Sequence, residues 1–346
     1  MNLPDFFGLD IGNHSIKLAQ VKKKSDTEAS LVALGSIAAP FGVVGSDNEE
    51  HKKQLAENIK NLLGSAEVGT KKVVAALPES AIFTRLAVFP DLPETELEDA
   101  VHWEAKQYIP LPLESVNLEF LKVGERDEAG SKKLEILLVA APKTLVDRYV
   151  EILKNAGLEL IALETETVAT TRSLTFNNTL TETVMLLDFG SNGTDMSVIK
   201  GKNPVFSQSL GTGSDALTKA ISLDFGLDMQ QAEQYKRTYG IDQTKVEGKI
   251  FKSLEPIVQV IVSEVSKTLN FFKSHFQTNV PKKVYLVGDG SILIGLPEYL
   301  SSKLGLPVER FDPLKSLVVD KKMQENVGGL AGIGYTVSIG LALKSE

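Results

Sequence analysis

The chain has 346 residues, of which 42% are hydrophobic and 24% are charged, so it is long and apolar enough for two lobes that each bury a full core. Its formal net charge of -8 argues against a general nucleic-acid binder, and the absence of cysteine excludes disulfides, thiol catalysis and cysteine zinc sites. No stretch approaches the ~20 apolar residues that span a bilayer, and the start lacks a signal-peptide core, so we expect a soluble cytoplasmic protein without direct membrane insertion.

The first predicted element is a tight β-hairpin at the start of the chain. An apolar run from Phe7 ends in Asp10, a turn with Gly12 follows, and a second apolar run begins around Lys17. Gly12 lets the backbone approach an anion closely, the N–H groups of the turn can cradle that anion, and Asp10 can hold Mg²⁺ through water. By itself, an Asp-x-Gly sequence is more simply explained as ordinary turn chemistry. The residues expected at a phosphate are Gly12, Asn13, Ser15 and Lys17.

The following segments alternate between strand and helix patterns, which favours an α/β lobe. They are a strand at 29–37, a helix at 51–63 that ends at Gly64, and a short buried strand at 73–77.

Residues 84–160 are predicted to form a small unit of their own, inserted into the first lobe. Its helix is acidic in the first turns, where the helix dipole favours carboxylates. After this unit, a strand and a helix that starts near Thr165 return the chain to the first lobe. The unit has the order β-α-β-β-α, with elements at 83–89, 95–108, 116–123, 134–140 and 143–156.

The Asp-x-Gly hairpin then occurs a second time. An apolar run from Val184 ends in Asp188, and a small polar turn and a second strand follow. A repeated unit is an architectural signal, and two such hairpins facing each other could clamp a triphosphate while Asp10 and Asp188 share one Mg²⁺. The run Asp188-Phe189-Gly190 also occurs in protein kinases, but the other kinase motifs are absent. The second set of phosphate-contacting residues is Gly190, Ser191, Asn192 and Gly193.

The rest of the chain is predicted to complete the second lobe. A strand at 204–210 leads to Gly213-Ser214, and a later strand at 284–287 opens into the turn Gly288-Asp289-Gly290-Ser291. The helices are expected at 216–223, 229–239, 250–276, 292–304 and 332–343, with a short strand at 308–311.

Two hairpins followed by a strand and a glycine turn resemble the actin/Hsp70/sugar-kinase ATPase superfamily. The resemblance implies an α/β, two-lobed actin-like (ribonuclease-H-like) ATPase fold with an inserted small β-α-β-β-α subdomain. It implies ATP and Mg²⁺ as ligands, with Asp10 and Asp188 at the metal. It places Glu233 of the run Ala232–Lys236 at the ribose, Lys236 at the adenine side and Lys267 over the base. Backbone contacts to the nucleotide are implied for Gly213, Ser214, Gly288, Gly290 and Ser291.

More specifically, the chain resembles the PilM family of type IV pilus assembly proteins over essentially its whole length. The segment from Leu92 to Leu111, with Tyr108-Ile109-Pro110, carries the most specific similarity, and Leu137–Lys143 and Asn155–Leu158 add to it. The resemblance implies a weak ATPase at most, acting as a scaffold of the inner-membrane assembly platform of a type IV pilus or a related type II secretion machine. It also implies that the chain is peripheral to the membrane through a protein partner. The implied partner is the N-terminal cytoplasmic peptide of PilN, held between residues 84–160 and the first lobe. Further implied contacts are PilO through PilN, the assembly ATPases and self-association.

The resemblance also divides the chain into subdomains. The predicted first-lobe core is 1–83 and 161–183, the inserted partner-binding subdomain 84–160, the second-lobe core 184–223 and 281–346, and the helical subdomain on the adenosine side 224–280.

Hydrolysis requires a group that orients water, and Glu166 occupies the position where related actin-like proteins carry a water-positioning Glu. A simple helix-start carboxylate is the alternative for Glu166. Two departures from the family pattern, Ser214 in place of a second glycine and Asp289 within the glycine turn, put ATP affinity in doubt.

Two other functions remain open at the level of the sequence. An FtsA-like cell-division homologue would be expected to end in a linker and an amphipathic membrane helix, whereas this sequence ends at Leu341–Glu346. A small-molecule kinase of the same superfamily would need a polar substrate pocket, which the inserted unit does not suggest. Near its prolines this unit carries Trp103, Tyr108, Ile109 and Phe120, of which Trp103 and Phe120 are most simply explained as core residues.

Overall fold

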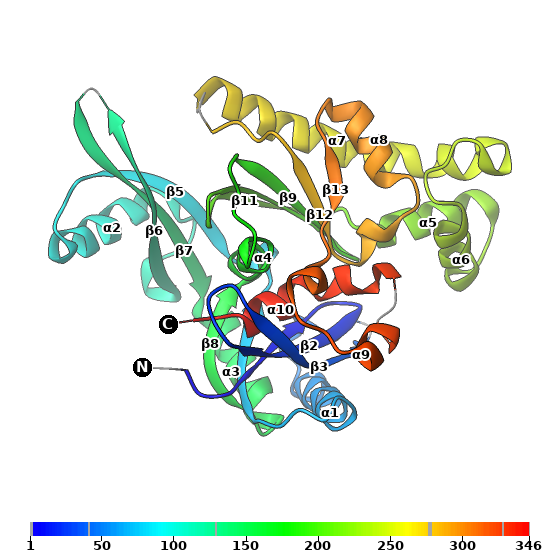
Figure 1. The fold of residues 1–346 in the computed structure, drawn as a ribbon, viewed down its shortest axis with the longest axis horizontal. Helices are drawn as coiled ribbons and strands as arrows, with labels where there is room; N and C mark the ends of the chain where they lie inside the picture. Colours follow the sequence, from blue (N-terminus) through cyan, green and yellow to red (C-terminus); the bar gives the residue numbers. More distant parts are fainter. Residues whose placement is uncertain (1–2, 41, 129, 276–278, 327–328, 346) are drawn as a thin grey trace. The chain divides into compact units, whose positions relative to one another are not determined.

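The computed structural model describes residues 3–40, 42–128, 130–275, 279–326 and 329–345. The chain divides into two compact units, each treated separately below. Unit 1 comprises residues 1–177, 202–208 and 337–346, and unit 2 comprises residues 178–201 and 209–336. Figure 1 shows the elements of both, coloured along the chain.

Unit 1 is built on a mixed sheet with the strand order β3-β2-β1-β4-β8. The first three strands form an antiparallel meander, and β4 and β8 add to it in parallel. Parallel pairs require crossover connections, which here are supplied by helices. The strands are β1 (Phe7–Ile11), β2 (Ser15–Lys23), β3 (Ala29–Ala38), β4 (Lys72–Leu77) and β8 (Glu159–Thr165).

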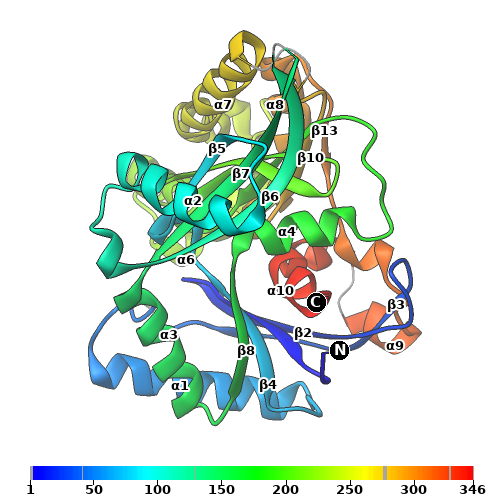
Figure 2. The ribbon, with the colours of Figure 1, turned by 90° about the vertical axis from the view of Figure 1, so that its left-hand side faces the viewer.

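Both faces of this sheet are buried, which explains why β4 is apolar without alternation. Val73 and Ala75 face a core shared with α1 (Glu49–Ser65) and α3 (Lys143–Asn155). Val74 and Ala76 face the opposite side, where they pack with α4 (Glu166–Thr175) and α10 (Thr336–Ala342). Figure 2 shows α1 and α3 on one side of the sheet and α10 on the other.

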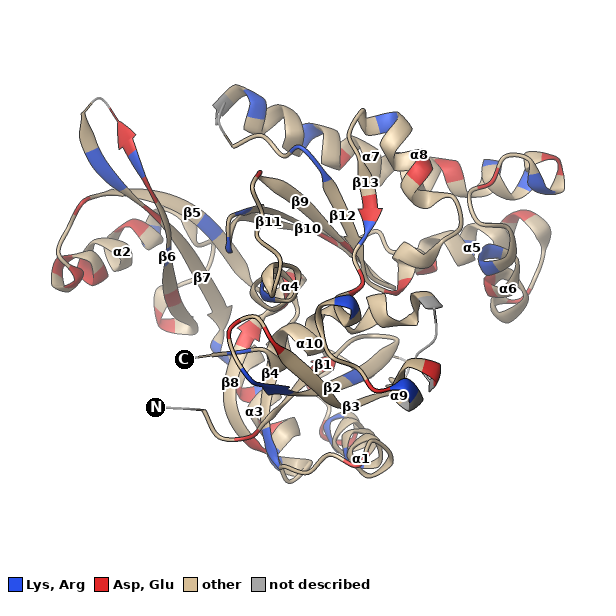
Figure 3. Cartoon of the chain, viewed as in Figure 1, with Lys and Arg blue, Asp and Glu red and all other residues tan. Residues whose placement is uncertain are grey.

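The inserted block forms a second, antiparallel sheet with the order β5-β7-β6. Leu97, Val101 and Ala105 of the long helix of this block pack in the core formed with the sheet. Figure 3 shows the acidic start of that helix, which carries Glu94 and Glu96 in its first turn. The elements are β5 (Phe83–Pro90), α2 (Glu94–Tyr108), β6 (Val116–Glu128) and β7 (Ser131–Pro142).

The element order β-α-β-β-α agrees with the prediction, but the last helix packs elsewhere. Leu145, Tyr149, Ile152 and Leu153 of α3 belong to the core of the first sheet. The inserted sheet is therefore covered by α2, while α3 stabilises the first sheet beside α1.

Unit 2 contains a sheet of the same design, with the order β11-β10-β9-β12-β13, except that residues 203–208 of its edge strand β11 are grouped with unit 1. A central strand again pairs with an antiparallel partner on one side and a parallel partner on the other. The repeat predicted from the two hairpins therefore extends to both sheets. The strands are β9 (Val184–Phe189), β10 (Thr194–Lys200), β11 (Asn203–Leu210), β12 (Val284–Val287) and β13 (Val308–Arg310).

Three helices of unit 2 lie within two residues of the predicted bounds, the helix predicted at 292–304 begins at residue 296, and a short helix at 321–326 was not predicted. The 27-residue α7 contains Pro256 in its interior. The helices are α5 (Ser214–Phe225), α6 (Met229–Tyr239), α7 (Lys249–His275), α8 (Leu296–Leu304) and α9 (Lys321–Asn326).

Three predicted boundaries differ from the structure. Residues 178–183 were expected in the first lobe but belong to unit 2, and residues 202–208 were expected in the second lobe but belong to unit 1. Residues 281–346 were expected in the second lobe, but residues 337–346 belong to unit 1. The physical reason is close packing on glycine, since Gly8 of β1 lies against the backbone of α10 at Ser338 and Ala342. The predicted helix at 332–343 is also shorter, because residues 329–335 form a 3₁₀ segment before α10.

Candidate functional site

The first Asp-x-Gly hairpin forms as predicted, between β1 and β2. Asp10 lies directly opposite Lys17 in the strand register, and Lys17 is buried. The Gly12 N–H donates to the Ser15 carbonyl at 3.0 Å, which closes the turn. Asn13 is exposed at the tip, and Gly12 and Ser15 are half-buried. The hairpin thus presents a carboxylate and an ammonium on neighbouring strands beside a small turn.

The second hairpin repeats this construction in unit 2. The Gly190 N–H donates to the Gly193 carbonyl at 2.9 Å, the same bond that Gly12 makes to Ser15. Asp188 lies opposite Asp195, so this hairpin carries a second carboxylate where the first carries a lysine. Its tip residues Ser191 and Asn192 are half-buried and exposed, respectively.

The Gly213-Ser214 segment packs directly on the second hairpin. The N–H groups of Ser214 and Asp215 each donate to it at 2.9 Å, reaching the carbonyls of Gly190 and Ser191. A Cβ at position 213 would overlap the Ser191 carbonyl, so glycine is required by this approach. Ser214 begins α5 and is buried.

Glu233 and Lys236 form one network beneath the start of α5. The Lys236 ammonium donates to the Ser214 carbonyl at 3.2 Å and to Thr218 Oγ1 at 2.9 Å, and it pairs with Glu233 at 2.7 Å. Burial works to raise the pKa of Glu233, but hydrogen bonds from Lys236, Thr218 and Arg237 outweigh it and lower the pKa to about 2. Lys267 lies apart on α7, exposed and paired with Glu264 at 2.6 Å. The network supports α5, and the ligand contacts of these residues stay predictions.

The later glycine turn packs against the end of β9. A Cβ at Gly288, whose φ is +81°, would overlap the Asp188 carboxylate, and one at Gly290 would lie 2.7 Å from the Phe189 carbonyl. Ser291 is fully buried and its hydroxyl donates to the Gly288 carbonyl at 2.7 Å. Asp289 is exposed. These glycines are needed for protein packing around Asp188, a role that the sequence alone does not show.

Glu166 is the first residue of α4, as predicted, and its carboxylate is held from outside the helix. The Glu79 N–H donates to Glu166 Oε2 at 2.8 Å. Burial raises the pKa of Tyr149, and the charges of Glu166 and Asp10 raise it further. Both carboxylates therefore lie near this buried phenol in unit 1.

The residues present fit a hydrated Mg²⁺ and a polyphosphate. Each unit offers one aspartate at a strand end beside a glycine turn, and Mg²⁺ needs few protein carboxylates because it keeps most of its waters. Among the described residues, no cluster of three or more acidic or histidine ligands occurs.

A separate hollow lies in unit 1, between α4, Leu121 of the inserted sheet and residues 202–204 at the start of β11. Its volume is about 280 Å³. Thr171 is 1% exposed, lines this hollow, and its Oγ1 has no hydrogen-bond partner among the described residues. We call this hollow the α4 groove. It is lined by Lys23, Asp26, Leu121, Val168, Thr171, Arg172, Thr175, Phe176, Lys202, Asn203, Pro204, Leu343 and Ser345.

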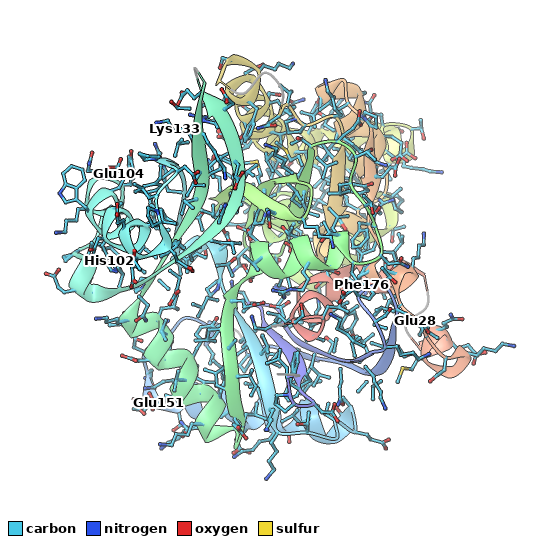
Figure 4. The ribbon with its side chains drawn as sticks, turned by 60° about the vertical axis from the view of Figure 1, so that its left-hand side comes forward. Glu28, His102, Glu104, Lys133, Glu151 and Phe176 are labelled. Carbon is cyan, nitrogen blue, oxygen red and sulfur yellow. The ribbon has the colours of Figure 1, made fainter. Side chains whose placement is uncertain are left out.

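The aromatic and apolar residues of the inserted block differ in their environments. Ile109 is buried in the core of the block, and Phe120 and Tyr108 pack against that core. Trp103, by contrast, is 66% exposed, so its expected core role is wrong. It lies on α2, the helix that His102 and Glu104 mark in Figure 4.

Sequence reasoning missed Glu79 and Thr171. Glu79 follows the carboxyl end of a parallel strand, where functional groups of α/β sheets gather, so that signal was present. Thr171 belongs to a run of threonines in α4, and threonine is a poor choice for a helix interior. No pattern of the sequence singles out Tyr149.

A family model and a solved structure match almost the full length of the chain. The family model described as "Type IV pilus assembly protein PilM" matches residues 8–346. The solved structure entitled "PilM-PilN type IV pilus biogenesis complex" has a TM-score of 0.84 and 29% identity, and covers 98% of both chains. MreB5 of Spiroplasma citri bound to AMPPNP has a TM-score of 0.51 at 13% identity, covering 97% of this chain and 94% of that one, which shows the actin-like fold alone.

Curated relatives are more distant. FtsA of Enterococcus hirae is 23% identical over 256 residues, which is 68% of this chain and 58% of that protein, and FtsA of Bacillus subtilis is 20% identical over 258 residues with the same coverage. The chain thus spans little more than half the length of these relatives. No helix among the described residues is long and apolar enough to cross a membrane.

The predicted two-lobed actin-like fold is confirmed, and from the match over residues 8–346 the chain belongs to the type IV pilus assembly protein PilM family.

Proposed function

We propose that this chain is an ATP-binding, actin-like scaffold of the type IV pilus inner-membrane platform that binds the N-terminal cytoplasmic tail of PilN. The observation that carries the proposal is the similarity, over 98% of the chain, to a structure entitled as a PilM-PilN complex. Through this tail the chain would be cytoplasmic and peripheral to the inner membrane. As part of this platform, we also propose contacts with PilO through PilN, with the assembly ATPases and with a second copy of the chain.

We propose that the tail binds in the α4 groove. Leu121, Phe176 and Pro204 supply apolar walls, and the buried Thr171 hydroxyl can bond a polar group of a peptide. Burying that hydroxyl without a partner is costly, so a ligand that pairs with it gains affinity. Lys23, Arg172 and Lys202 make the rim mainly basic.

The strand β6 gives the groove a second means of recognition. It is a 13-residue edge strand of the inserted sheet, with Leu121 exposed on it. An unpaired strand edge can receive an extended peptide by main-chain hydrogen bonds, while alternate side chains enter pockets. An extended tail that pairs with β6 would therefore also reach the groove.

Point substitutions test whether the tail binds in the α4 groove. Excising residues 84–160 would remove α3, which contributes to the first core, so a lost interaction would be uninterpretable. Leu121→Arg should weaken binding of a synthetic PilN tail peptide at least about tenfold, because it fills the groove with charge. The matched control is Val32→Arg, because Val32 lies on a strand of the same unit, outside the groove, and is 44% exposed against 43% for Leu121. Equal peptide affinity in the two variants would place the tail elsewhere.

For the nucleotide, we propose that Asp10 and Asp188 bind Mg²⁺-ATP, with the turns at Gly12 and Gly190 at the phosphates. When bound, Mg²⁺-ATP would supply a phosphoanhydride bond open to attack by water. Glu166, fixed by the Glu79 N–H, is proposed to orient that water. Since one such group is proposed, hydrolysis should be far slower than the ~10 s⁻¹ of typical enzymes, and Glu166→Ala should slow it further.

Two other functions compete with this proposal. Sugar-kinase activity would appear as phosphate transfer from ATP to a small alcohol, and FtsA-like activity as recruitment to division sites. We expect the protein to bind the PilN tail peptide and to transfer no phosphate from ATP to any sugar in a test panel.

A further inference from the structure

Glu79 is a buried carboxyl group for which neither ATP nor the tail accounts. It lies in the short 3₁₀ turn between β4 and β5 and is 4% exposed. In the described chain its side-chain partners are uncharged: the Ser207 hydroxyl donates to Oε1, and the Thr167 N–H donates to Oε2 at 3.4 Å. Burial without a cation raises the pKa of Glu79, although these hydrogen bonds oppose the shift.

Two hydrogen-bonded connections meet at this residue. In one direction, its backbone N–H holds the Glu166 carboxylate and its side chain bonds the next residue of α4. In the other, Ser207 of β11 bonds Thr84 of β5, the first strand of the inserted sheet. The chain Thr84–Ser207–Glu79 thus joins the inserted sheet to the start of α4.

We propose that Glu79 is a positioning residue that couples the α4 groove to Glu166, so that the tail and the nucleotide change each other's affinity. This inference rests on the proposed function. Leu121 of the inserted sheet and Thr171 of α4 both line the groove, so a bound peptide touches the two elements that the connection joins. A movement of the inserted sheet would be passed through Ser207 and Glu79 to the residue that holds the water.

A buried polar chain of this kind suits the role because its members depend on one another. A hydrogen bond inside the protein is stronger than one in water, and a partly broken network leaves buried groups unsatisfied. The hydrogen bonds of this network should therefore switch between discrete arrangements rather than stretch gradually, as in other allosteric elements. Coupling between two ligands is reciprocal, so it can be measured from either side.

The experiment measures the affinity of the whole chain for Mg²⁺-AMPPNP by calorimetry, with and without saturating PilN tail peptide. We expect the peptide to change this affinity by about fivefold or more, within the usual range of coupling. Ser207→Ala and Thr84→Val should reduce the change to less than about twofold, while each ligand alone still binds as in the unmodified protein. Glu79→Gln should retain the coupling, because its amide oxygen can accept from the Thr167 N–H while its NH₂ group donates to the Ser207 hydroxyl, which can then donate to Thr84; Glu79→Ala should lose the coupling.

Ser30→Ala serves as the control, because Ser30 lies on β3 and has no side-chain hydrogen bond among the described residues. It should leave the coupling intact. Coupling that is absent in the unmodified protein, or that survives both Ser207→Ala and Glu79→Ala, overturns the inference.

A second readout needs no ligand and separates this inference from the proposed function. Ser207→Ala should speed amide hydrogen exchange in the first turn of α4, and Ser30→Ala should not. If the tail or the nucleotide fails to bind the unmodified protein, the proposed function fails. If exchange at α4 is unchanged in Ser207→Ala, the positioning role of Glu79 fails, whichever ligands bind.

Discussion

At the scale of single residues, Glu233 is held ionised by its neighbours. Its pKa is about 2 against 4.5 for a free glutamate, so the folded state gains stability above pH 4.5 and loses it as the pH falls toward 2. Glu233→Gln should lower the free energy of unfolding at pH 7 by about 1 to 2 kcal/mol, after allowing for the partial exposure of the group. The difference should shrink as the pH falls below 4.5 and disappear near pH 2 in urea titrations followed by circular dichroism.

Glu264→Gln provides the comparison, since Glu264 forms a similar pair with a lysine that is exposed. Surface pairs contribute little, so this variant should change stability by less than about 0.5 kcal/mol. An equal loss of stability in both variants would show that the Lys236 network stabilises unit 2 no more than a surface ion pair does.

Glu79 has the opposite pH behaviour. Its folded-state pKa lies above the unfolded value, so its stabilising contribution is complete below pH 4.5 and declines as the pH rises through the folded pKa. Glu79→Gln cannot ionise, so its stability relative to the unmodified protein should increase from pH 4 to pH 8, by up to about 1.4 kcal/mol for each tenfold change in the acid dissociation constant on folding. Parallel stability curves for the two proteins would contradict burial of an ionisable carboxyl group.

At the scale of elements, α10 depends on two glycines of unit 1. A Cβ at Gly8 would overlap the Ser338 carbonyl, and a Cβ at Gly340 would overlap the Ala169 carbonyl of α4. Because backbone atoms cannot move aside cheaply, Gly8→Ala and Gly340→Ala should each destabilise the protein by about 3 kcal/mol in denaturant titrations.

Gly64 supplies the control for this prediction. It lies inside α1 with open space around the position of a Cβ. Alanine is the better helix former, so Gly64→Ala should stabilise the protein by up to about 1 kcal/mol. If Gly64→Ala destabilises the protein, or if Gly340→Ala does not, close backbone packing of α10 does not explain the effect of these glycine substitutions.

At the scale of the whole molecule, nucleotide binding should appear as added stability. A ligand at 100 times its dissociation constant contributes about 2.7 kcal/mol, which for a chain of this size is about 5 °C in melting temperature. Mg²⁺-ATP should raise the melting temperature of the unmodified protein by this order, and Asp10→Ala and Asp188→Ala should abolish the increase while remaining folded.

The exposed Asp26 gives the matched control, because its side chain is 98% exposed in a surface turn. Asp26→Ala should keep the full increase. A normal thermal shift in both Asp10→Ala and Asp188→Ala would contradict the proposed metal ligands.

The sequence by itself determined the elements and the repeat. The hairpins at Asp10 and Asp188 were predictable because strand alternation and glycine turns are local properties of the chain. The long α7 was predictable for the same reason, since a 3.6-residue apolar period extends over 27 residues. Similar motifs in the right order then indicated the actin-like fold and the PilM family.

Only the tertiary structure decided where these elements pack and which polar groups meet. α3 packs in the core of the first sheet, and α10 packs in unit 1. The sequence shows that each helix has an apolar face, but an apolar face alone does not specify which neighbour it packs against. Trp103 is exposed although its residue type favours burial, since α2 has only one side on the inserted sheet. Glu79, which no motif singled out, meets Ser207 across 128 positions of sequence, and contacts of that range depend on the completed fold.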